Sequence, residues 1–295
     1  MRHGLQEMSL HLNRMQAVAP SRTALRVALR RAAHQLYDAK PLVLDDPIAT
    51  AILGERYAEE LRRTPIRPDR PFSVALRAFI VARSRYAEDM LNDAVAQGVT
   101  QYVLLGAGLD TFAHRNPYSD LRVFEVDHPA TQSWKRELLD ESTLPSPKNL
   151  VYAPVDFETQ DLPTQLRAAG FDPEASTFFA WLGVVPYLTH GAFRTTLDFI
   201  ASRPRGSGLV LDYAQPRSAL PFREQLAYDS LASRVQLAGE PFQLFFTPSK
   251  IATELDAFYN LEDLGSPEIN ARYFEGRADN LRALGSAGRL LSAWL

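Results

Sequence analysis

The feature that most constrains the fold of this chain is an apolar strand that stops in a glycine loop, followed by a second strand that ends in an acid. Residues 103–108 read VLLGAG, and residues 123–127 read VFEVD. In an open parallel sheet, neighbouring strands end at the same edge, and ligands bind outside those ends. Gly106 and Gly108 carry no Cβ and let the backbone approach a ligand closely, whereas Asp127 can accept both hydroxyls of a ribose. The two segments together predict a nucleoside site.

The rest of the chain alternates between strands and helices from residue 101 onward. Apolar runs predict strands at 101–105, 122–127, 150–155, 177–182 and 208–213, and helical spacing predicts helices at 129–141, 161–169 and 190–202. This alternation is typical of an α/β fold with a mostly parallel, Rossmann-like sheet and helices on both faces. A helix at 248–258 and strands at 260–264 and 290–295 close the chain.

Two segments depart from this rhythm. Helical spacing upstream predicts helices at 22–38, 48–61 and 72–97, with a proline-containing loop at 64–71, so residues 1–97 are expected to form an N-terminal helical extension or lid. Residues 98–295 then form the core, interrupted at about 215–247 by an inserted helical cap. We expect one structural unit.

Composition excludes several classes of protein. The 295 residues include no cysteine and carry a net charge of -3, so disulfides, thiolate metal sites and general attraction to nucleic acid are not expected. The six histidines form no pair at metal-ligand spacing, and no metal is predicted. No apolar run reaches the roughly 20 residues that span a bilayer, so a cytoplasmic enzyme is expected, with its oligomeric state open. Neither a Walker Gly-Lys-Ser/Thr sequence nor a Gly-x-Ser-x-Gly elbow occurs.

The glycine loop itself favours one nucleoside over another. A dinucleotide fingerprint would place a third small residue where Thr111 stands. Asp110 would oppose a pyrophosphate at a helix N-terminus, whereas the sulfonium and ammonium of S-adenosylmethionine tolerate a carboxylate. The loop therefore favours the methyl donor, with an NAD-dependent oxidoreductase as the alternative. A tight turn without a ligand is the structural alternative.

Three further positions extend the predicted cofactor site. Asp156 and Phe157 end the third strand, where a carboxylate and a backbone N–H could hold adenine, although Asp156 could equally cap a turn. Asp127 could likewise cap the helix that follows it. Arg83 falls inside the apolar stripe of the helix at 72–97 and needs an anionic partner. That partner is either the carboxylate of the methionine moiety, which suits bidentate arginine, or an acid of the protein.

The sequence gives fewer indications of the residues that would bind the methyl acceptor. Tyr187 and Tyr213 follow the fourth and end the fifth strand, where either could orient an oxygen nucleophile or simply pack. No histidine or acid stands out as a general base, so no catalytic residue is assigned; a carboxylate acceptor, which needs no base, is weakly favoured. Aromatic residues of the insertion suggest an apolar lid over a small acceptor, or packing alone; they are Phe222, Tyr228, Phe242, Phe245 and Phe246.

Taken in order, these motifs resemble the leucine carboxyl methyltransferase-like family of S-adenosylmethionine-dependent enzymes. The resemblance rests on residues 83–86 (RSRY), 105–111 (LGAGLDT), 124–129 (FEVDHP), 156–157 (DF) and 184–188 (VVPYL), and residues 42–47 (LVLDDP) also fit.

The resemblance implies a class I methyltransferase sheet with a helical extension and a lid. It implies that Arg83 binds the methionine carboxylate, Gly106 and its neighbours the methionine backbone, Asp127 the ribose, and Asp156 with Phe157 the adenine.

The chain departs from the family at Leu182, where members often carry Glu, and any cofactor contact of that Glu is missing. Nothing in the sequence points to the protein substrate of the protein-directed branch. We therefore expect an O-methyltransferase that acts on a small-molecule carboxylate or hydroxyl, such as a secondary metabolite. A non-catalytic protein that binds S-adenosylmethionine is a further alternative, because a fold does not fix a function.

Overall fold

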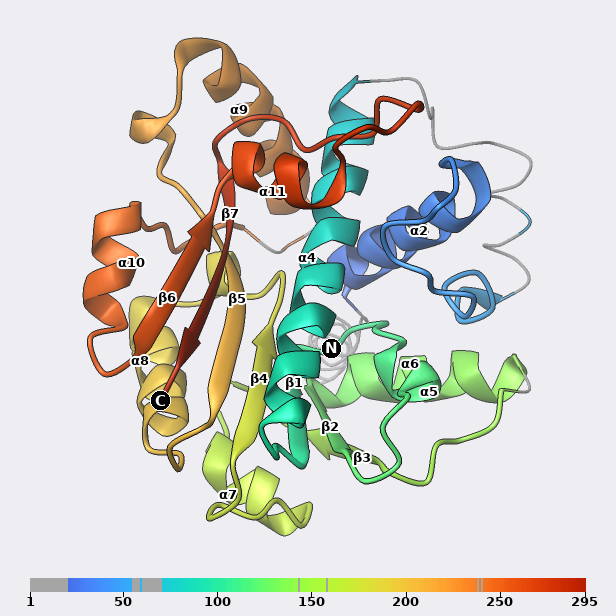
Figure 1. Cartoon of the computed structure of the whole chain (residues 1–295), viewed down its shortest axis with the longest axis vertical. Helices are drawn as coiled ribbons and strands as arrows, with labels where there is room; N and C mark the ends of the chain where they lie inside the picture. Colours follow the sequence, from blue (N-terminus) through green and yellow to red (C-terminus); the bar gives the residue numbers. More distant parts are fainter. Residues whose placement is uncertain are drawn as a thin grey trace, which may run out of the picture.

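A seven-stranded sheet lies at the centre of the computed structural model (Figure 1), which describes residues 21–54, 59, 71–142, 144–157, 159–237, 239 and 241–295. The strand order is β3-β2-β1-β4-β5-β7-β6. The strands are β1 (Gln101–Leu105), β2 (Arg122–Asp127), β3 (Leu150–Pro154), β4 (Thr177–Trp181), β5 (Gly208–Ala214), β6 (Tyr259–Leu264) and β7 (Gly288–Trp294). Strands β1 to β5 are parallel, and β7 runs antiparallel between β5 and β6. The predicted mostly parallel α/β sheet is confirmed.

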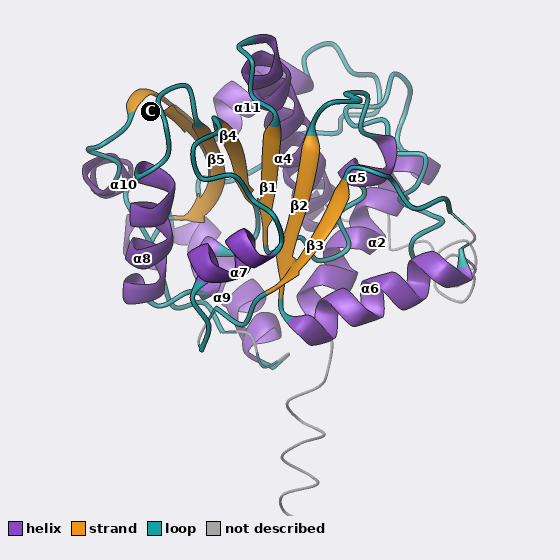
Figure 2. Ribbon diagram, turned by 90° about the horizontal axis from the view of Figure 1, so that it is seen from below, coloured by secondary structure: helices purple, strands orange, loops and turns teal. Residues whose placement is uncertain are grey.

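Helices connect these strands and cover both faces of the sheet (Figure 2). The α-helices are α2 (Arg22–Tyr37), α4 (Pro71–Ala96), α5 (Phe112–Arg115), α6 (Pro129–Glu141), α7 (Leu162–Ala168), α8 (His190–Ala201), α9 (Phe222–Gln236), α10 (Pro248–Glu254) and α11 (Ser266–Tyr273). Short 3-10 helices are η1 (Val185–Tyr187) and η2 (Arg217–Ala219). In the part of the chain described, no helix is long and apolar enough to cross a membrane.

One predicted helix, over 48–61, is only partly confirmed, because residues 48–53 are turns whereas Gly54 and Glu59 are helical. Residues 47–53 form hydrogen-bonded turns rather than the start of a helix over 48–61, with Ile52 N donating to the carbonyl of Ile48 at 3.0 Å. Asp46 just before these turns is fully buried in ion pairs, so tertiary contacts shape this segment. The remainder of that prediction, and most of the predicted loop at 64–71, lies outside the described residues.

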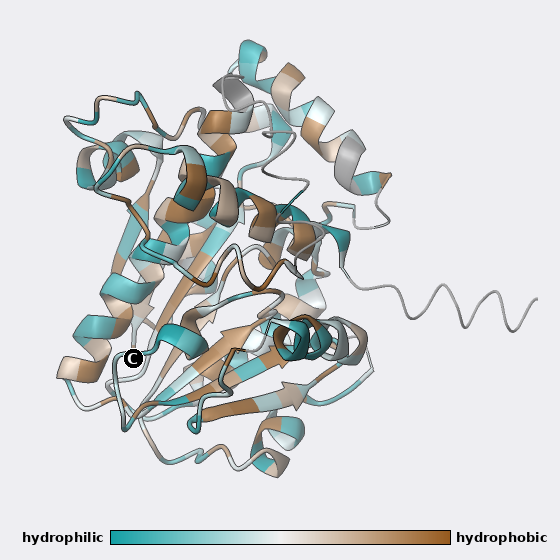
Figure 3. Ribbon diagram, turned by 90° about the vertical axis from the view of Figure 1, so that its right-hand side faces the viewer, coloured by the Kyte–Doolittle hydropathy of each residue, from teal (hydrophilic) through white to brown (hydrophobic). Residues whose placement is uncertain are grey.

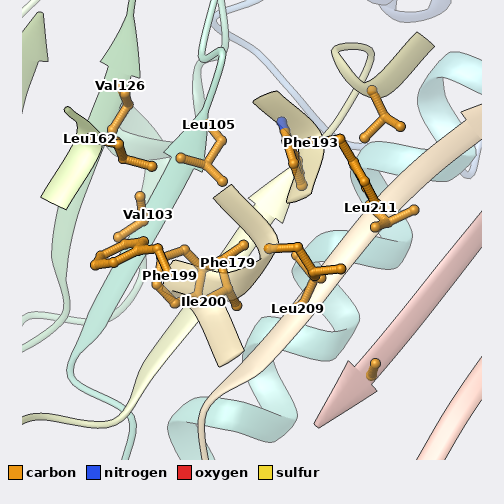
Figure 4. Close-up of a cluster of buried hydrophobic side chains, with 14 of the residues drawn as sticks. Val103, Leu105, Val126, Leu162, Phe179, Phe193, Phe199, Ile200, Leu209 and Leu211 are labelled. Carbon is orange, nitrogen blue, oxygen red and sulfur yellow. The ribbon is translucent and has the colours of Figure 1, made fainter. Parts of the chain in front are cut away.

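Apolar side chains of alternate strand residues pack on opposite faces of the sheet. On one face, Val103, Phe179 and Leu209 pack against α7 and α8 (Figure 4). On the other, Leu104 and Ala180 pack against α4 and α5. Figure 3 shows the central strands as hydrophobic along much of their length, as expected when both faces are covered.

The N-terminal helix α2 lies against α4, and a third apolar cluster joins it to α6 and to the turns at 48–53. The predicted insertion at 215–247 contains η2 and α9. Glu224 of α9 accepts hydrogen bonds from both N and Oγ of Ser286, each at 2.7 Å. The insertion is therefore fixed to the chain that leads into β7.

Candidate functional site

The glycine loop after β1 folds over the carboxyl end of β2. The N–H groups of Gly106 and Ala107 both donate to the carbonyl of Val126, at 2.8 and 3.0 Å. The N–H of Gly108 donates to Oδ2 of Asp127 at 2.5 Å. Three successive N–H groups therefore hold the loop in place, and they do not form the bare cradle that a pyrophosphate requires.

Both glycines are required by their backbone conformation and by close neighbours. Gly106 has φ +72°, and a Cβ built on it would lie 2.3 Å from Cγ2 of Val184, which follows β4. Gly108 has φ +52°, and its Cβ would lie 3.2 Å from Cβ of Ala24 in α2. The loop is thus in contact with the end of β4 on one side and with the N-terminal helix on the other.

Asp127 is held at the tip of β2 with both carboxylate oxygens oriented. Its Oδ1 accepts a hydrogen bond from the N–H of His128 at 2.7 Å, in addition to the bond from Gly108. An ionised carboxylate offers about four acceptor positions, so two positions remain for a ligand. Burial raises the pKa of Asp127, although the two N–H groups oppose that effect. The helix cap is His128, whose Nδ1 accepts from Ala130 N at 3.2 Å.

Asp110 does not face a ligand as the sequence argument assumed. Its Oδ2 pairs with Nη1 of Arg31 at 2.9 Å, and its Oδ1 accepts from the N–H of Phe112 at 2.7 Å. Arg31 and Lys135 lower the pKa of Asp110 against the effect of its burial. The carboxylate is satisfied by the N-terminal extension and by the first turn of α5, so its charge does not select a cation.

The same ion pairs connect the N-terminal extension to the glycine loop. Arg31 of α2 also donates from Nη2 to Asp46 and to Thr111, both at 2.6 Å. Arg115 of α5 lies 3.3 Å from the second oxygen of Asp46. Because Arg31 and Asp46 are almost completely buried, losing one partner would leave a buried charge unpaired. Sequence reasoning missed this network, since its members lie far apart in the chain.

Glu125 points away from the strand-end edge into a buried pair. Its Oε2 lies 2.6 Å from Nζ of Lys135 in α6, and both side chains are 1% exposed. Burial raises the pKa of Glu125. Of the two acids in β2, Asp127 is therefore the one left at the carboxyl edge.

Arg83 of α4 reaches the ends of β4 and β5. Its Nη1 lies 3.0 Å from Oδ2 of Asp212 in β5, and the two side chains are 10% and 8% exposed. The other oxygen of Asp212 accepts from the N–H of Gly183. A Cβ on Gly183 would lie 2.8 Å from Nη2 of Arg83, so the guanidinium rests against a glycine with φ +72°. Arg83 thus has the protein partner that the sequence left as an alternative.

Sequence reasoning missed Asp212. The signal was present, because an acid inside the apolar run of β5 resembles Asp127 inside β2. Leu182, which precedes Gly183, is half-buried and packs against the cluster on the α4 face.

Asp156 and Phe157 follow β3 as expected, in a tight turn. Oδ2 of Asp156 accepts from Oγ1 of Thr159 at 2.8 Å, and its carbonyl accepts from the N–H groups of Thr159 and Gln160. Phe157 packs against the large apolar cluster. The turn-capping role of Asp156 is therefore present, and it leaves the adenine role as a proposal.

The two candidate tyrosines lie in different surroundings. Tyr213 is buried, and its hydroxyl donates to Oδ2 of Asp263 in β6 at 2.7 Å. Burial and Asp263 raise the pKa of Tyr213. Tyr187 ends η1, and its ring lies 5.2 Å from that of Phe242 in the insertion. Only Tyr187 therefore joins the aromatic residues of the cap.

The aromatic residues of the insertion divide into three groups. Tyr228, Phe242 and Phe245 contact one another, with ring centroids 6.1 to 6.4 Å apart. Phe246 is buried in the core, and Phe222 is 75% exposed. The segment at 242–244 is hydrogen-bonded to the turn after β4, because the N–H groups of residues 243 and 244 both donate to the carbonyl of Pro186, at 2.7 and 3.2 Å. The insertion therefore covers this turn.

The strand order, the glycine loop after β1 and the acid at the tip of β2 together define the class I methyltransferase fold. The model of the leucine carboxyl methyltransferase family matches residues 24–201, and the chain belongs to this family. It is accordingly a methyltransferase that uses S-adenosylmethionine.

Two relatives illustrate the similarity. A Bacillus subtilis protein named "Putative S-adenosyl-L-methionine-dependent methyltransferase YktD" is 33% identical over 89% of this chain and 94% of its own length. A Mycobacteroides abscessus protein with the same description is 36% identical over 58% of this chain and 56% of its own length.

Solved structures support the fold. A "putative methyltransferase" from Thermobifida fusca has a TM-score of 0.55 at 16% identity, covering 91% of this chain and 93% of that chain. A DUF574 family protein from Streptomyces avermitilis has a TM-score of 0.51 at 17% identity, covering 90% and 96%.

Proposed function

We propose that this chain is an O-methyltransferase that transfers a methyl group to a carboxylate or hydroxyl of a small molecule, such as a secondary metabolite. The observation that carries the proposal is the insertion fastened over the turn after β4. Gln243 donates from its backbone N–H to Pro186 at 2.7 Å and from Nε2 to the carbonyl of Tyr187 at 2.9 Å. The ring of Phe242 in the same insertion lies 5.2 Å from that of Tyr187, and Phe242 in turn contacts Tyr228 and Phe245. An acceptor bound there meets the chain's own apolar cover, which favours a small molecule over a protein tail.

The cofactor would lie across the carboxyl ends of successive strands. Asp127 has two acceptor positions left for ribose hydroxyls, and Asp156 with Phe157 would hold adenine at the end of β3. Gly106 and Gly108 would allow the methionine chain to pass close to the backbone, towards Arg83. The polar groups along this edge suit an adenosine with an amino-acid tail, and S-adenosylmethionine supplies the activated methyl group when bound.

The residues of the chain have mainly to align the acceptor and exclude water. A carboxylate acceptor is already ionised at neutral pH and needs no base, whereas a hydroxyl gains from one. Among the candidates, Tyr213 is buried beneath the sheet edge, whereas Tyr187 lies on the turn after β4 that the insertion covers. We therefore assign Tyr187 the role of orienting an acceptor oxygen, in preference to Tyr213.

The proposal is tested by methyl transfer from radiolabelled S-adenosylmethionine to a panel of small carboxylates and phenols. Alkaline treatment of the product separates the two chemistries, because a methyl ester releases methanol and a methyl ether does not. The variant Tyr187→Phe keeps the ring and removes the hydroxyl, and Tyr228→Phe is the matched control within the same aromatic cluster.

We expect turnover on at least one acceptor, with a lower kcat in Tyr187→Phe and an unchanged kcat in Tyr228→Phe. Label recovered in amines alone would overturn O-methylation. Tight binding of S-adenosylhomocysteine without turnover on any acceptor would favour the non-catalytic alternative. Binding of NADH in place of S-adenosylhomocysteine would restore the oxidoreductase interpretation, which the occupied N–H groups of the glycine loop disfavour.

A further inference from the structure

The ion pair between Arg83 and Asp212 differs from a purely structural pair on the same helix. Arg77 of α4 donates to both oxygens of Asp38, from Nε at 2.8 Å and Nη2 at 2.7 Å. Within the described residues, Arg83 contacts Asp212 from Nη1 alone, at 3.0 Å. Arg77 and Asp38 are joined by two parallel hydrogen bonds, the bidentate arrangement. Arg83 gives Asp212 only one hydrogen bond, so another edge of its guanidinium can donate to a second acceptor.

Asp212 is also held from two directions. One oxygen faces the guanidinium of Arg83, and the other accepts the N–H of Gly183 after β4. Because Gly183 lacks a side chain, the guanidinium rests directly against its backbone. The carboxylate therefore fixes the relative position of α4, β4 and β5 at one point of the carboxyl edge.

This point lies next to the proposed path of the cofactor. Gly183 precedes Val184, and the side chain of Val184 occupies the space that a Cβ on Gly106 of the glycine loop would need. The sheet order places β2, with Asp127, on one side of β1 and places β4 and β5 on the other. With adenine at the end of β3, as proposed above, a ribose at Asp127 directs the 5′-substituent of the nucleoside to the other side of β2, towards the ends of β4 and β5.

We propose that Asp212 is a positioning residue for the amino-acid end of the cofactor. It presents the guanidinium of Arg83 to the α-carboxylate and, with its remaining lone pairs, accepts a hydrogen bond from the α-ammonium. The amino-acid end of the cofactor is a zwitterion, with one negative and one positive group. The guanidinium of Arg83 and the carboxylate of Asp212 together complement both charges, whereas either group alone complements only one. The inference rests on the proposed function, because it assumes that Asp127 holds the ribose.

The test compares two ligands on Asp212→Asn by calorimetry. S-adenosylhomocysteine carries the amino-acid end, and 5′-methylthioadenosine has the same nucleoside thioether without it. We expect Asp212→Asn to weaken S-adenosylhomocysteine about tenfold or more, since a hydrogen bond to a charged group contributes about 1.5–3 kcal/mol. The affinity for 5′-methylthioadenosine should change less than about twofold. Asp38→Asn, which breaks the bidentate pair on the same helix, is the matched control and should leave both affinities unchanged.

Binding of 5′-methylthioadenosine by the variant also shows that it is folded. If Asp212→Asn does not fold, the wild-type protein is titrated instead with S-adenosylhomocysteine analogues that lack the amine or the carboxylate. Each loss should cost about tenfold. Equal weakening of both ligands in Asp212→Asn, an unchanged affinity for S-adenosylhomocysteine, or wild-type indifference to the missing amine would overturn the role of Asp212. Failure of the wild type to bind S-adenosylhomocysteine at all would instead overturn the proposed function.

Discussion

Replacing Gly106 with alanine should destabilise the protein by two separable effects. The residue has φ +72°, and a side chain in the left-handed region costs about 1–2 kcal/mol. The new Cβ would also lie 2.3 Å from Cγ2 of Val184, and overpacking of this kind costs about 1–3 kcal/mol. We therefore expect Gly106→Ala to lower the free energy of unfolding by about 2–5 kcal/mol.

Two further variants separate the contributions. Gly98 has φ +95°, and its Cβ would meet no atom within 4 Å, so Gly98→Ala measures the backbone cost alone. In Gly106→Ala/Val184→Ala, the nearest remaining atom of residue 184 is Cβ at 3.5 Å, an ordinary contact. The steric part should then disappear, and the double variant should be more stable than the sum of the two single effects.

Urea unfolding followed by tryptophan fluorescence gives these free energies. The same variants are titrated with S-adenosylhomocysteine, because a displaced loop should also weaken the cofactor. The reasoning is refuted if Gly106→Ala costs no more than Gly98→Ala, or if the two substitutions at 106 and 184 are strictly additive.

Three other predictions concern single charged residues. Asp127→Ala should weaken S-adenosylhomocysteine more than about tenfold while the protein stays folded, as calorimetry with circular dichroism would show; an unchanged affinity would contradict the ribose role. Lys135→Met should lower the free energy of unfolding by about 3–5 kcal/mol by leaving Glu125 buried and unpaired, whereas Lys135→Met with Glu125→Met should cost far less; equal costs in urea unfolding would argue against the pair. Arg277 and nearby N–H groups lower the pKa of Asp279 from 3.8 to about 2. Because this pKa is lower in the folded state, its contribution, about 1 kcal/mol after solvent screening, is complete above pH 3.8 and disappears between pH 3.8 and 2. Asp279→Asn should therefore make acid unfolding less steep in that interval, and an unaltered pH profile would count against it.

The pattern of apolar residues predicted most strands and helices. Because the sheet is covered on both faces, its strands are continuous apolar runs and its helices carry an apolar stripe. The strands at 101–105 and 122–127 and the helices at 22–38 and 72–97 are found within one residue of their predicted ends. The antiparallel direction of β7 was not predicted, because the sequence of an apolar strand does not indicate its direction in the sheet. The short helix α11 was missed as well. Of the helix expected at 48–61, residues 48–53 form turns, and Gly54 and Glu59 are helical. The turns directly follow Asp46, which distant arginines fix.

The individual site residues were predictable only where a charge interrupts an apolar pattern. Asp127 and Arg83 stood out because each is a charge within an apolar pattern. Asp110 carried the wrong interpretation, because its partner Arg31 lies 79 residues away in the sequence. Asp212 was overlooked for the same reason, since its partner Arg83 lies 129 residues away. Sequence spacing shows which charges need partners, but the fold decides whether the partner is a ligand or another side chain.

That distinction also explains why the choice of cofactor was right although one of its arguments was not. Asp110 was expected to repel a phosphate directly, yet Arg31 neutralises it. What disfavours a pyrophosphate is the use of the N–H groups of Gly106, Ala107 and Gly108 within the loop itself. With these donors occupied, the loop can offer close approach but no anion cradle. Among the described residues, the charged groups along the edge include the carboxylates of Asp127, Asp156 and Asp212 and the guanidinium of Arg83. They suit a sugar and a zwitterion, and S-adenosylmethionine carries both.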